Sequence, residues 1–286
     1  MSNKYDKYKK KKFWKEMLPA LSISGTENKV IPESKYFDLE LNRSTLVAEG
    51  YQEFPEVLSN KEVTKLRDGI IALHKNQMLP VFCMLFDEYW QCVAKFQKLL
   101  VNVLGAEALM LPDFWAWHVD PKKSESGWGP HRDKLSNTLT HDGMPKSLTM
   151  WIALSDATPK NGCMYMVPAD QDPYYLSFDT KDVPTDMQSV RALPAKAGTA
   201  FIWNQRVFHW GGKSQKTSVS PRISIAFEFQ RGDIAPYNEP LLPLQLFPDF
   251  ETRLRLVGKQ ILQYRHMYGF SDDLTSLAQS FFKTSG

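Results

Sequence analysis

The chain of 286 residues is poor in cysteine and histidine and has no long apolar run. Its three cysteines, Cys83, Cys92 and Cys163, are an odd number in largely apolar contexts. This pattern argues against a disulfide framework and favours buried thiols in a reducing compartment. No run of about 18 apolar residues exists, so no transmembrane helix is expected, and the start of the chain lacks the pattern of a signal peptide. We therefore expect a cytoplasmic protein without a membrane partner.

Positive charge is concentrated at the start of the chain. Residues 1–16 contain seven lysines and two acidic residues, a net charge of +5. The whole chain has a net charge of +3, so the remaining residues carry −2. We expect residues 1–18 to be a basic, disordered tail and residues 19–286 to form a single domain. No arginine cluster or nucleic-acid module follows, so no nucleic-acid partner is expected.

Helical patterns flank a central region of short strands. Ser59 and Glu62 form a capping box before apolar residues at helical spacing. A second helical pattern runs from about residue 80 to 104, and residues 244–286 return to helix. Strand-like segments separated by Gly, Pro, Asn and Asp lie between them, at residues 110–119, 148–154, 163–167, 199–203 and 222–229. This order predicts a β-sandwich or barrel core at about residues 109–232.

Two His-x-Asp triplets, His131-Arg132-Asp133 and His118-Val119-Asp120, contain candidate metal ligands. Side chains at i and i+2 of an extended segment point the same way, so either pair can hold one ion. A second histidine must then come from another strand, and His209 is available downstream. Two imidazoles and one carboxylate form the facial set that holds non-haem Fe(II) with coordination positions left open.

The flanking residues favour His131 over His118. Residues 127–130 before it are Gly-Trp-Gly-Pro, and glycine lets the backbone pass close to a bound group. Asp120, in contrast, is followed by a proline and a polar loop. We therefore predict His131, Asp133 and His209 as the metal ligands. His118 stays a candidate for the substrate pocket, as does His141, which lies in a predicted loop turn.

Residues 148–168, Leu-Thr-Met-Trp through Tyr-Met-Val-Pro, resemble the characteristic segment of the phytanoyl-CoA dioxygenase family. The family consists of Fe(II)- and 2-oxoglutarate-dependent oxygenases and carries a His-x-Asp shortly before this segment, where His131 and Asp133 stand here. Residues 49–63 are similar to the family's opening strand and helix, so the resemblance spans about residues 45–235. One difference is Pro168-Ala169-Asp170, where the family often has Pro-Gly-Ser-His.

The resemblance implies a double-stranded β-helix, the jelly-roll of cupin-like proteins, with Fe(II), 2-oxoglutarate and O₂ as cofactors. Within residues 222–229, large apolar side chains alternate with Arg222, Ser224 and Ala226. Arg222 and Ser224 can therefore offer a guanidinium and a hydroxyl to the distal carboxylate of 2-oxoglutarate. Arg206 is a weaker alternative, because we expect it in a connecting turn.

Three further residues complete the predicted site. Thr149 is a candidate hydroxyl donor to the co-substrate, although a plain strand threonine is an equal alternative. Trp151 and Trp203 are candidates for the wall of the substrate pocket, although aromatic residues at strand positions more often belong to a core.

The expected activity is hydroxylation of a small molecule, with release of succinate and CO₂. Asp133 favours hydroxylation over halogenation, because related halogenases lack this carboxylate. Two alternatives remain: a non-catalytic β-helix protein that binds a small molecule, and a metal-dependent cupin-like enzyme that does not use 2-oxoglutarate. The sequence identifies neither the substrate nor the oligomeric state.

Overall fold

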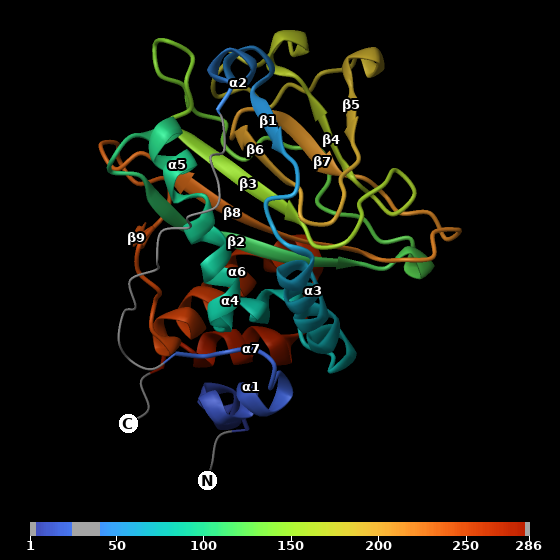
Figure 1. The fold of residues 1–286 in the computed structure, drawn as a ribbon, viewed down its shortest axis with the longest axis vertical. Coiled ribbons are helices and arrows are strands. Elements are labelled where there is room, and N and C mark those ends of the chain that lie inside the picture. Colours follow the sequence, from blue (N-terminus) through green and yellow to red (C-terminus); the bar gives the residue numbers. More distant parts are fainter. Residues whose placement is uncertain (1–3, 25–40, 284–286) are drawn as a thin grey trace.

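Two antiparallel sheets form the centre of the protein, with helices on the outer side of the larger one (Figure 1). The computed structural model describes residues 4–24 and 41–283. The large sheet has six strands in the order β1-β6-β3-β8-β2-β9, and the small sheet has three in the order β5-β4-β7. This is the jelly-roll type of fold expected from the sequence.

The strands of the large sheet are β1 (Tyr51–Phe54), β2 (Leu109–Val119), β3 (Ser147–Ala153), β6 (Ala200–Asn204), β8 (Arg222–Gln230) and β9 (Leu242–Pro243). Those of the small sheet are β4 (Met164–Val167), β5 (Arg191–Leu193) and β7 (Phe208–Gly211). The α-helices are α1 (Lys11–Met17), α2 (Arg43–Glu49), α3 (Asn60–Lys75), α4 (Asp87–Lys95), α5 (Gln97–Leu104), α6 (Phe250–Tyr268) and α7 (Asp272–Ser280). Short 3₁₀ helices include η1 (Asp6–Lys9), η2 (Pro80–Leu85), η3 (Pro121–Lys123), η4 (Ala169–Gln171) and η5 (Met187–Ser189).

The predicted elements are present with small shifts at their ends. Helix α3 begins with the predicted capping box, in which the side chains and backbone N–H groups of Ser59 and Glu62 bond reciprocally. The long helical pattern at 80–104 is divided into η2, α4 and α5. The breaks fall at Phe86, which has an extended backbone, and at Phe96. Both phenylalanines are fully buried, so packing accounts for the apolar pattern continuing across the breaks.

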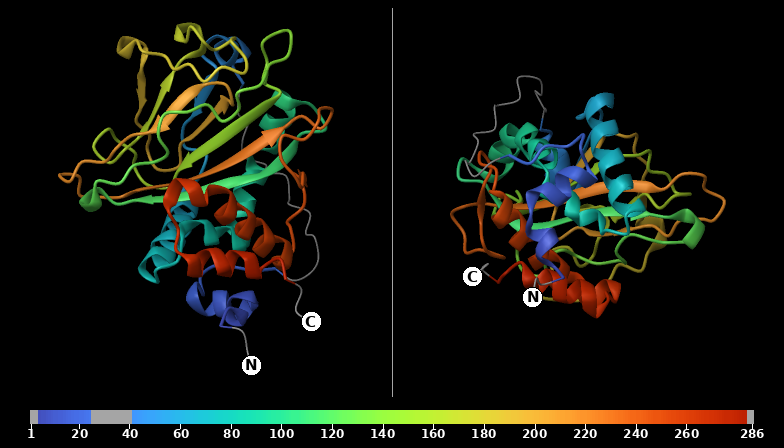
Figure 2. Two further views of the ribbon diagram at one scale, coloured as in Figure 1. Left: turned by 180° about the vertical axis from the view of Figure 1, so that it is seen from behind. Right: turned by 90° about the horizontal axis from the view of Figure 1, so that it is seen from below.

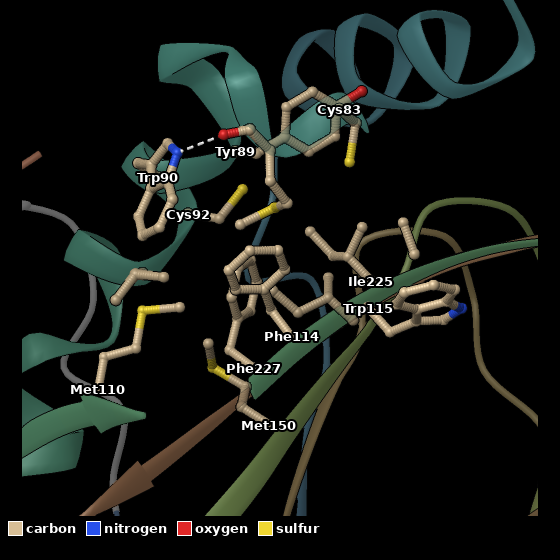
Figure 3. Close-up of a cluster of buried hydrophobic side chains, with 14 of the residues drawn as sticks. Cys83, Tyr89, Trp90, Cys92, Met110, Phe114, Trp115, Met150, Ile225 and Phe227 are labelled. Atoms are coloured by element: carbon tan, nitrogen blue, oxygen red, sulfur yellow. Dashed lines mark hydrogen bonds between the residues drawn. The ribbon is translucent and has the colours of Figure 1, made fainter. Parts of the chain in front are cut away.

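Strand β8 lies between β2 and β3 and separates two apolar clusters. Its large apolar side chains face the helices, where Ile225 and Phe227 pack with Phe114 and Met150 (Figure 3). Its other face looks toward the small sheet, and Ala226 belongs to the cluster between the sheets. The alternation predicted for residues 222–229 is therefore confirmed, and it directs Arg222 and Ser224 into the space between the sheets.

The N-terminal segment differs from the expected disordered tail. Residues 11–17 form α1, and Trp14 is fully buried, with its ring stacked 4.9 Å from that of Phe82. Its Nε1 donates to the carbonyl of Tyr8 at 2.7 Å, while Lys4 pairs with Asp273 of α7. Figure 2 shows this segment against the helical layer. The apolar contacts of the buried Trp14 therefore hold this lysine-rich segment against the helices. Residues 1–3 of the predicted tail lie outside the described residues.

All three cysteines are buried and free, as expected. In residues 4–24 and 41–283, none of the helices combines the length and the apolar character needed to cross a bilayer.

Candidate metal centre

His131 and His209 are held side by side by the backbone. The N–H of each donates to the carbonyl of the other at 3.0 Å, which forms an isolated antiparallel bridge between residue 131 and strand β7. The two imidazole rings lie with their centroids 4.4 Å apart. The histidine that had to come from another strand is thus supplied by β7 of the small sheet.

Asp133 completes a triad with these histidines. Its Oδ1 lies 3.2 Å from Nε2 of His131 and 3.6 Å from Nε2 of His209. The three candidate ligand atoms lie within 4.8 Å of one another, close enough to hold one metal ion. His131 Nε2 is buried and has no hydrogen-bond partner, as expected of an atom reserved for a ligand. The donor set of two imidazoles and a carboxylate fits Fe(II).

Each histidine is oriented through its second ring nitrogen. Nδ1 of His131 lies 2.7 Å from the carbonyl of Gly129, and Nδ1 of His209 lies 2.9 Å from that of Val207. A carbonyl can only accept, so both Nδ1 atoms carry the proton and both Nε2 lone pairs face Asp133. Such outer contacts are the usual means by which proteins fix the tautomer of a metal-binding histidine.

The second carboxylate oxygen of Asp133 is fixed by two donors from the large sheet. Its Oδ2 accepts from the Thr149 hydroxyl of β3 at 2.7 Å and from Nε1 of Trp203 of β6 at 3.0 Å. Oδ1 is thereby left to face the histidines. Gln205 donates to the Thr149 oxygen at 3.3 Å, which orients the hydroxyl toward Asp133.

The protonation states of His209 and Asp133 suit metal binding. Burial lowers the pKa of His209 to about 4, so its imidazole is neutral at pH 7. Burial alone would raise the pKa of Asp133, but His209, His131 and the Thr149 hydroxyl outweigh it and lower this pKa well below its usual range. A neutral imidazole and an ionised carboxylate are the forms that ligate a metal.

Arg132 points away from the triad and secures the segment that carries it. Its guanidinium forms a buried pair with Asp172, in which Nη2 donates to Oδ1 at 3.0 Å, and Nη1 donates to the carbonyl of Arg206 at 2.7 Å. Arg206 in turn donates to the backbone carbonyls of Leu135, Tyr174, Tyr175 and Ser177. Arg206 therefore has a structural position in the turn, as its place in the sequence suggested.

A cavity between the sheets includes the triad. Arg222 lines one part of it with Trp117 and Trp151, whose rings lie 6.0 and 5.9 Å from the guanidinium carbon. The floor is made of backbone at Gly127 and Gly211. A Cβ on Gly127 would lie 2.8 Å from Nη2 of Arg222, and one on Gly211 would lie 2.7 Å from the Cα of Gly127, so glycine is needed for this close approach.

Arg222 is a buried cation without an anionic partner among the described residues. It is 1% exposed, and its one hydrogen bond is donated by Nη1 to the Ser224 hydroxyl at 2.6 Å. Nε and Nη2 have no partner. Burial lowers the pKa of Arg222 to about 10, so it stays charged at neutral pH. Since an unpaired buried charge is costly, this part of the cavity is suited to an anion.

Two predicted pocket residues do not reach the cavity. His118 pairs across the sheet with Ile223, on the helix-facing side, while its neighbour Trp117 pairs with Ser224 on the cavity side. The His118 ring instead stacks 3.9 Å from that of His74 on α3. The alternation of side chains along β2 is the physical reason. His141 is exposed in its loop turn and does not line the cavity.

The other predicted pocket residues lie at the site, some in different roles. Trp151 and Trp203 both line the cavity, and Trp203 also donates to Asp133. Thr149 lines it too, but its proton is donated to Asp133. A contact between Thr149 and 2-oxoglutarate stays a prediction.

Sequence reasoning missed the acidic part of the cavity. Glu228 and Asp113 both line it, and each is at least nine-tenths buried. Burial raises the pKa of Glu228 to about 8, partly offset by Lys134. The alternation of β8 that selected Arg222 also places Glu228 on the same face, so this residue was detectable. Asp113 was not, because it lies where the pairing of β2 with β8 shifts register between Met110 and Phe114.

The model of the family described as phytanoyl-CoA dioxygenase (PhyH) matches residues 80–222, half of the chain. This chain belongs to that family. The matched segment contains the whole triad and ends at Arg222. Iron and 2-oxoglutarate are the family's cofactors, and the triad has the ligand set that such oxygenases use. No match was found among curated proteins.

Solved structures with the same fold include two enzymes of nogalamycin biosynthesis. The non-haem α-ketoglutarate-dependent carbocyclase SnoK has 19% identity and a TM-score of 0.53, covering 71% of this chain and 97% of its own. The epimerase SnoN in complex with Fe³⁺, α-ketoglutarate and nogalamycin RO has 19% identity and a TM-score of 0.52, covering 70% and 93%. HygX from Streptomyces hygroscopicus, with nickel, 2-oxoglutarate and hygromycin B bound, has 12% identity and a TM-score of 0.53, covering 70% and 91%.

Proposed function

We propose that the protein is an Fe(II)- and 2-oxoglutarate-dependent dioxygenase that hydroxylates a small molecule and releases succinate and CO₂. One observation supports this most strongly. A buried arginine with two unpartnered nitrogens, Arg222, lines the same cavity as a triad of metal-ligand type. A metal-dependent enzyme without an anionic co-substrate would have no use for this cation.

In this proposal His131, Asp133 and His209 hold the iron. These three protein ligands would leave coordination positions open for 2-oxoglutarate and O₂. Iron and 2-oxoglutarate, when bound, supply the oxidation of a substrate C–H bond. The intact ligand set disfavours a non-catalytic binding protein.

The remaining residues bind and orient. Arg222 and Ser224 receive the distal carboxylate of 2-oxoglutarate through a charge-assisted hydrogen bond and a hydroxyl. Trp117 and Trp151 exclude water around the guanidinium, which strengthens its interaction with an anion. Thr149 and Trp203 keep Asp133 in the orientation that leaves Oδ1 for the metal.

Similar structures include an epimerase and a carbocyclase, so epimerisation and ring closure are the alternatives to hydroxylation. Asp133 occupies the position that a halide would need, which favours oxidation by oxygen. Product mass distinguishes the outcomes: hydroxylation adds one oxygen atom, ring closure removes two hydrogen atoms, and epimerisation leaves the mass unchanged.

The test is anaerobic addition of Fe(II) and 2-oxoglutarate to the metal-free protein. We expect the weak visible absorption band of an Fe(II)–2-oxo acid chelate, and succinate after admission of O₂. Neither should form with His131→Ala. Absence of both the band and succinate in the wild-type protein would contradict the proposal.

A further inference from the structure

The two ends of the cavity have opposite charge. Arg222 and Glu228 lie on the same face of β8, six residues apart, which corresponds to about 20 Å along an extended strand. Glu228 pairs across the sheet with Thr149, and Gln205 links the two, donating to Glu228 at 2.7 Å and to Thr149 at 3.3 Å. Because Thr149 holds Asp133, Glu228 lies beside the metal centre, at the end of the cavity away from Arg222.

Glu228 is not fully satisfied by the protein. It is 9% exposed, and its Oε2 accepts from Gln205 at 2.7 Å and from Lys134 at 3.2 Å. Within residues 4–24 and 41–283, Oε1 has no hydrogen-bond donor, although the side chain lines the cavity. An accessible carboxylate oxygen on a residue that lines the cavity, without a donor from the protein, is free to accept from a ligand.

Asp113 adds a second buried carboxylate at this end. It is 2% exposed and accepts only from neutral amides, those of Asn238 at 2.8 Å and Gln263 at 2.6 Å. Lys259 reaches the Asn238 oxygen at 2.9 Å and forms no ion pair with Asp113. No cation in the described part of the chain lies within ion-pair distance of Asp113.

When Glu228 is ionised, the charges of the loaded site do not balance without a further cation. Iron, Asp133 and the 2-oxo acid carboxylate sum to zero, and Arg222 offsets the distal carboxylate. Lys134 is then the one cation facing two carboxylates, Glu228 and Asp113. The ionised form of Glu228 would leave one negative charge in a largely buried cavity, where an unpaired charge is costly. A bound cation would favour the ionised form, because it supplies the missing partner.

Aromatic rings also line the cavity, and among those of Tyr264, Trp115 and Trp128 it is Tyr264 that lies near Glu228 and Asp113. Tyr264 follows Gln263, the residue that donates to Asp113, and its ring lies 4.6 Å from that of Trp128 and 5.2 Å from that of Trp115. All three rings line the cavity. Aromatic faces combined with carboxylates bind organic cations by cation–π attraction and ion pairing.

We propose that the substrate carries a positively charged nitrogen, as a protonated amine or a quaternary ammonium, which binds between Glu228, Asp113 and the aromatic rings. This inference rests on the proposed function, because it places the substrate opposite the Arg222 end, with the metal between. The charged group is then held on one side of the iron, and a carbon a few bonds away lies over the metal.

The test compares isosteric compounds that differ in charge. The protein is loaded with Ni(II), which prevents turnover, and with 2-oxoglutarate. It is then titrated by calorimetry with choline or its neutral isostere 3,3-dimethylbutan-1-ol, and with benzylamine or benzyl alcohol. We expect the cation of at least one pair to bind at least tenfold more tightly than its neutral partner. Equal or tighter binding of the neutral compounds in both pairs would overturn the proposal.

Variants that remove one carboxylate test whether Glu228 and Asp113 cause the preference for a cation over its neutral isostere. Glu228→Gln and Asp113→Asn should each reduce the preference for the cation several-fold, whereas Glu251→Gln, on the exposed surface of α6, should not change it. An unchanged preference in both cavity variants would place the cation elsewhere and overturn the assignment.

The Fe(II)–2-oxoglutarate absorption band, recorded for each protein, distinguishes failure of the proposed function from failure of the cationic-substrate inference. Its absence in the wild type contradicts the proposed function, whereas its presence without a charge preference contradicts only the cationic substrate.

Discussion

Trp203 donates its indole N–H to Oδ2 of Asp133 at 3.0 Å. Trp203 lies on β6 of the large sheet, whereas His209 lies on β7 of the small sheet. The contact selects which carboxylate oxygen faces the metal. Trp203 therefore positions the candidate metal ligand Asp133, in addition to lining the cavity.

We predict that Trp203→Phe weakens metal binding by roughly tenfold, the low end for loss of a contact to a metal ligand. The phenyl ring keeps most of the packing but lacks the N–H donor. Trp151→Phe is the matched control, because Trp151 Nε1 has no hydrogen-bond partner. Titration of both metal-free variants with Co(II) measures the difference. Equal affinities would show that the Trp203 contact does not position Asp133.

Replacement of His131 should abolish metal retention, whereas replacement of His118 should not. His131 presents a free Nε2 to Asp133, while His118 stacks on His74 on the other side of the large sheet. Metal content after reconstitution and desalting checks this. Loss of metal from His118→Ala, with His131→Ala unaffected, would reverse the choice of triplet.

Arg222→Met should raise the KM for 2-oxoglutarate by at least about tenfold, the equivalent of 1.4 kcal/mol, while metal binding persists. The cause is loss of the charge-assisted hydrogen bond to the distal carboxylate. The same variant should leave the metal-free protein as stable or more stable, because an unpaired buried cation is removed. Arg255→Met, on the exposed face of α6, serves as the control. An unchanged KM would exclude Arg222 from co-substrate binding.

His209 should contribute a loss of stability to the metal-free protein as the pH falls from about 6.5 to about 4. Burial holds the pKa of folded His209 near 4, below the unfolded value of 6.5. The unfolded state therefore binds more protons in this window, and acid favours unfolding. For a fully buried group the effect is on the order of 3 kcal/mol. Chemical denaturation across this range should show a smaller loss in His209→Gln, and an identical loss would contradict the assignment.

Local patterns predicted the elements and the orientation of one strand well, because side-chain alternation is a local property. The alternation of β8 placed Arg222 in the lining of the cavity, with Ser224 bonded to it on the same face of the strand. The same alternation along β2 places His118 on the face opposite the cavity, but this follows only once the pairing of Trp117 with Ser224 is known. Such pairings depend on contacts between distant segments, which no single segment encodes.

The contacts of Asp133 illustrate the same limit. Thr149 and Trp203 lie on β3 and β6, which pair with each other at these two residues. Each was assigned to a ligand pocket, and neither sequence position indicates that both donate to one carboxylate oxygen. The buried Trp14 shows the opposite error: the density of lysine around it outweighed one aromatic residue that anchors the segment.

The origin of the three candidate ligands has a mechanical consequence. The two histidines are joined through the backbone to β7 of the small sheet, whereas Asp133 is hydrogen-bonded to β3 and β6 of the large sheet. An ion bound by all three cross-links the two sheets at the point where they face each other. Such an ion would restrain the spacing between the sheets, and with it the width of the cavity.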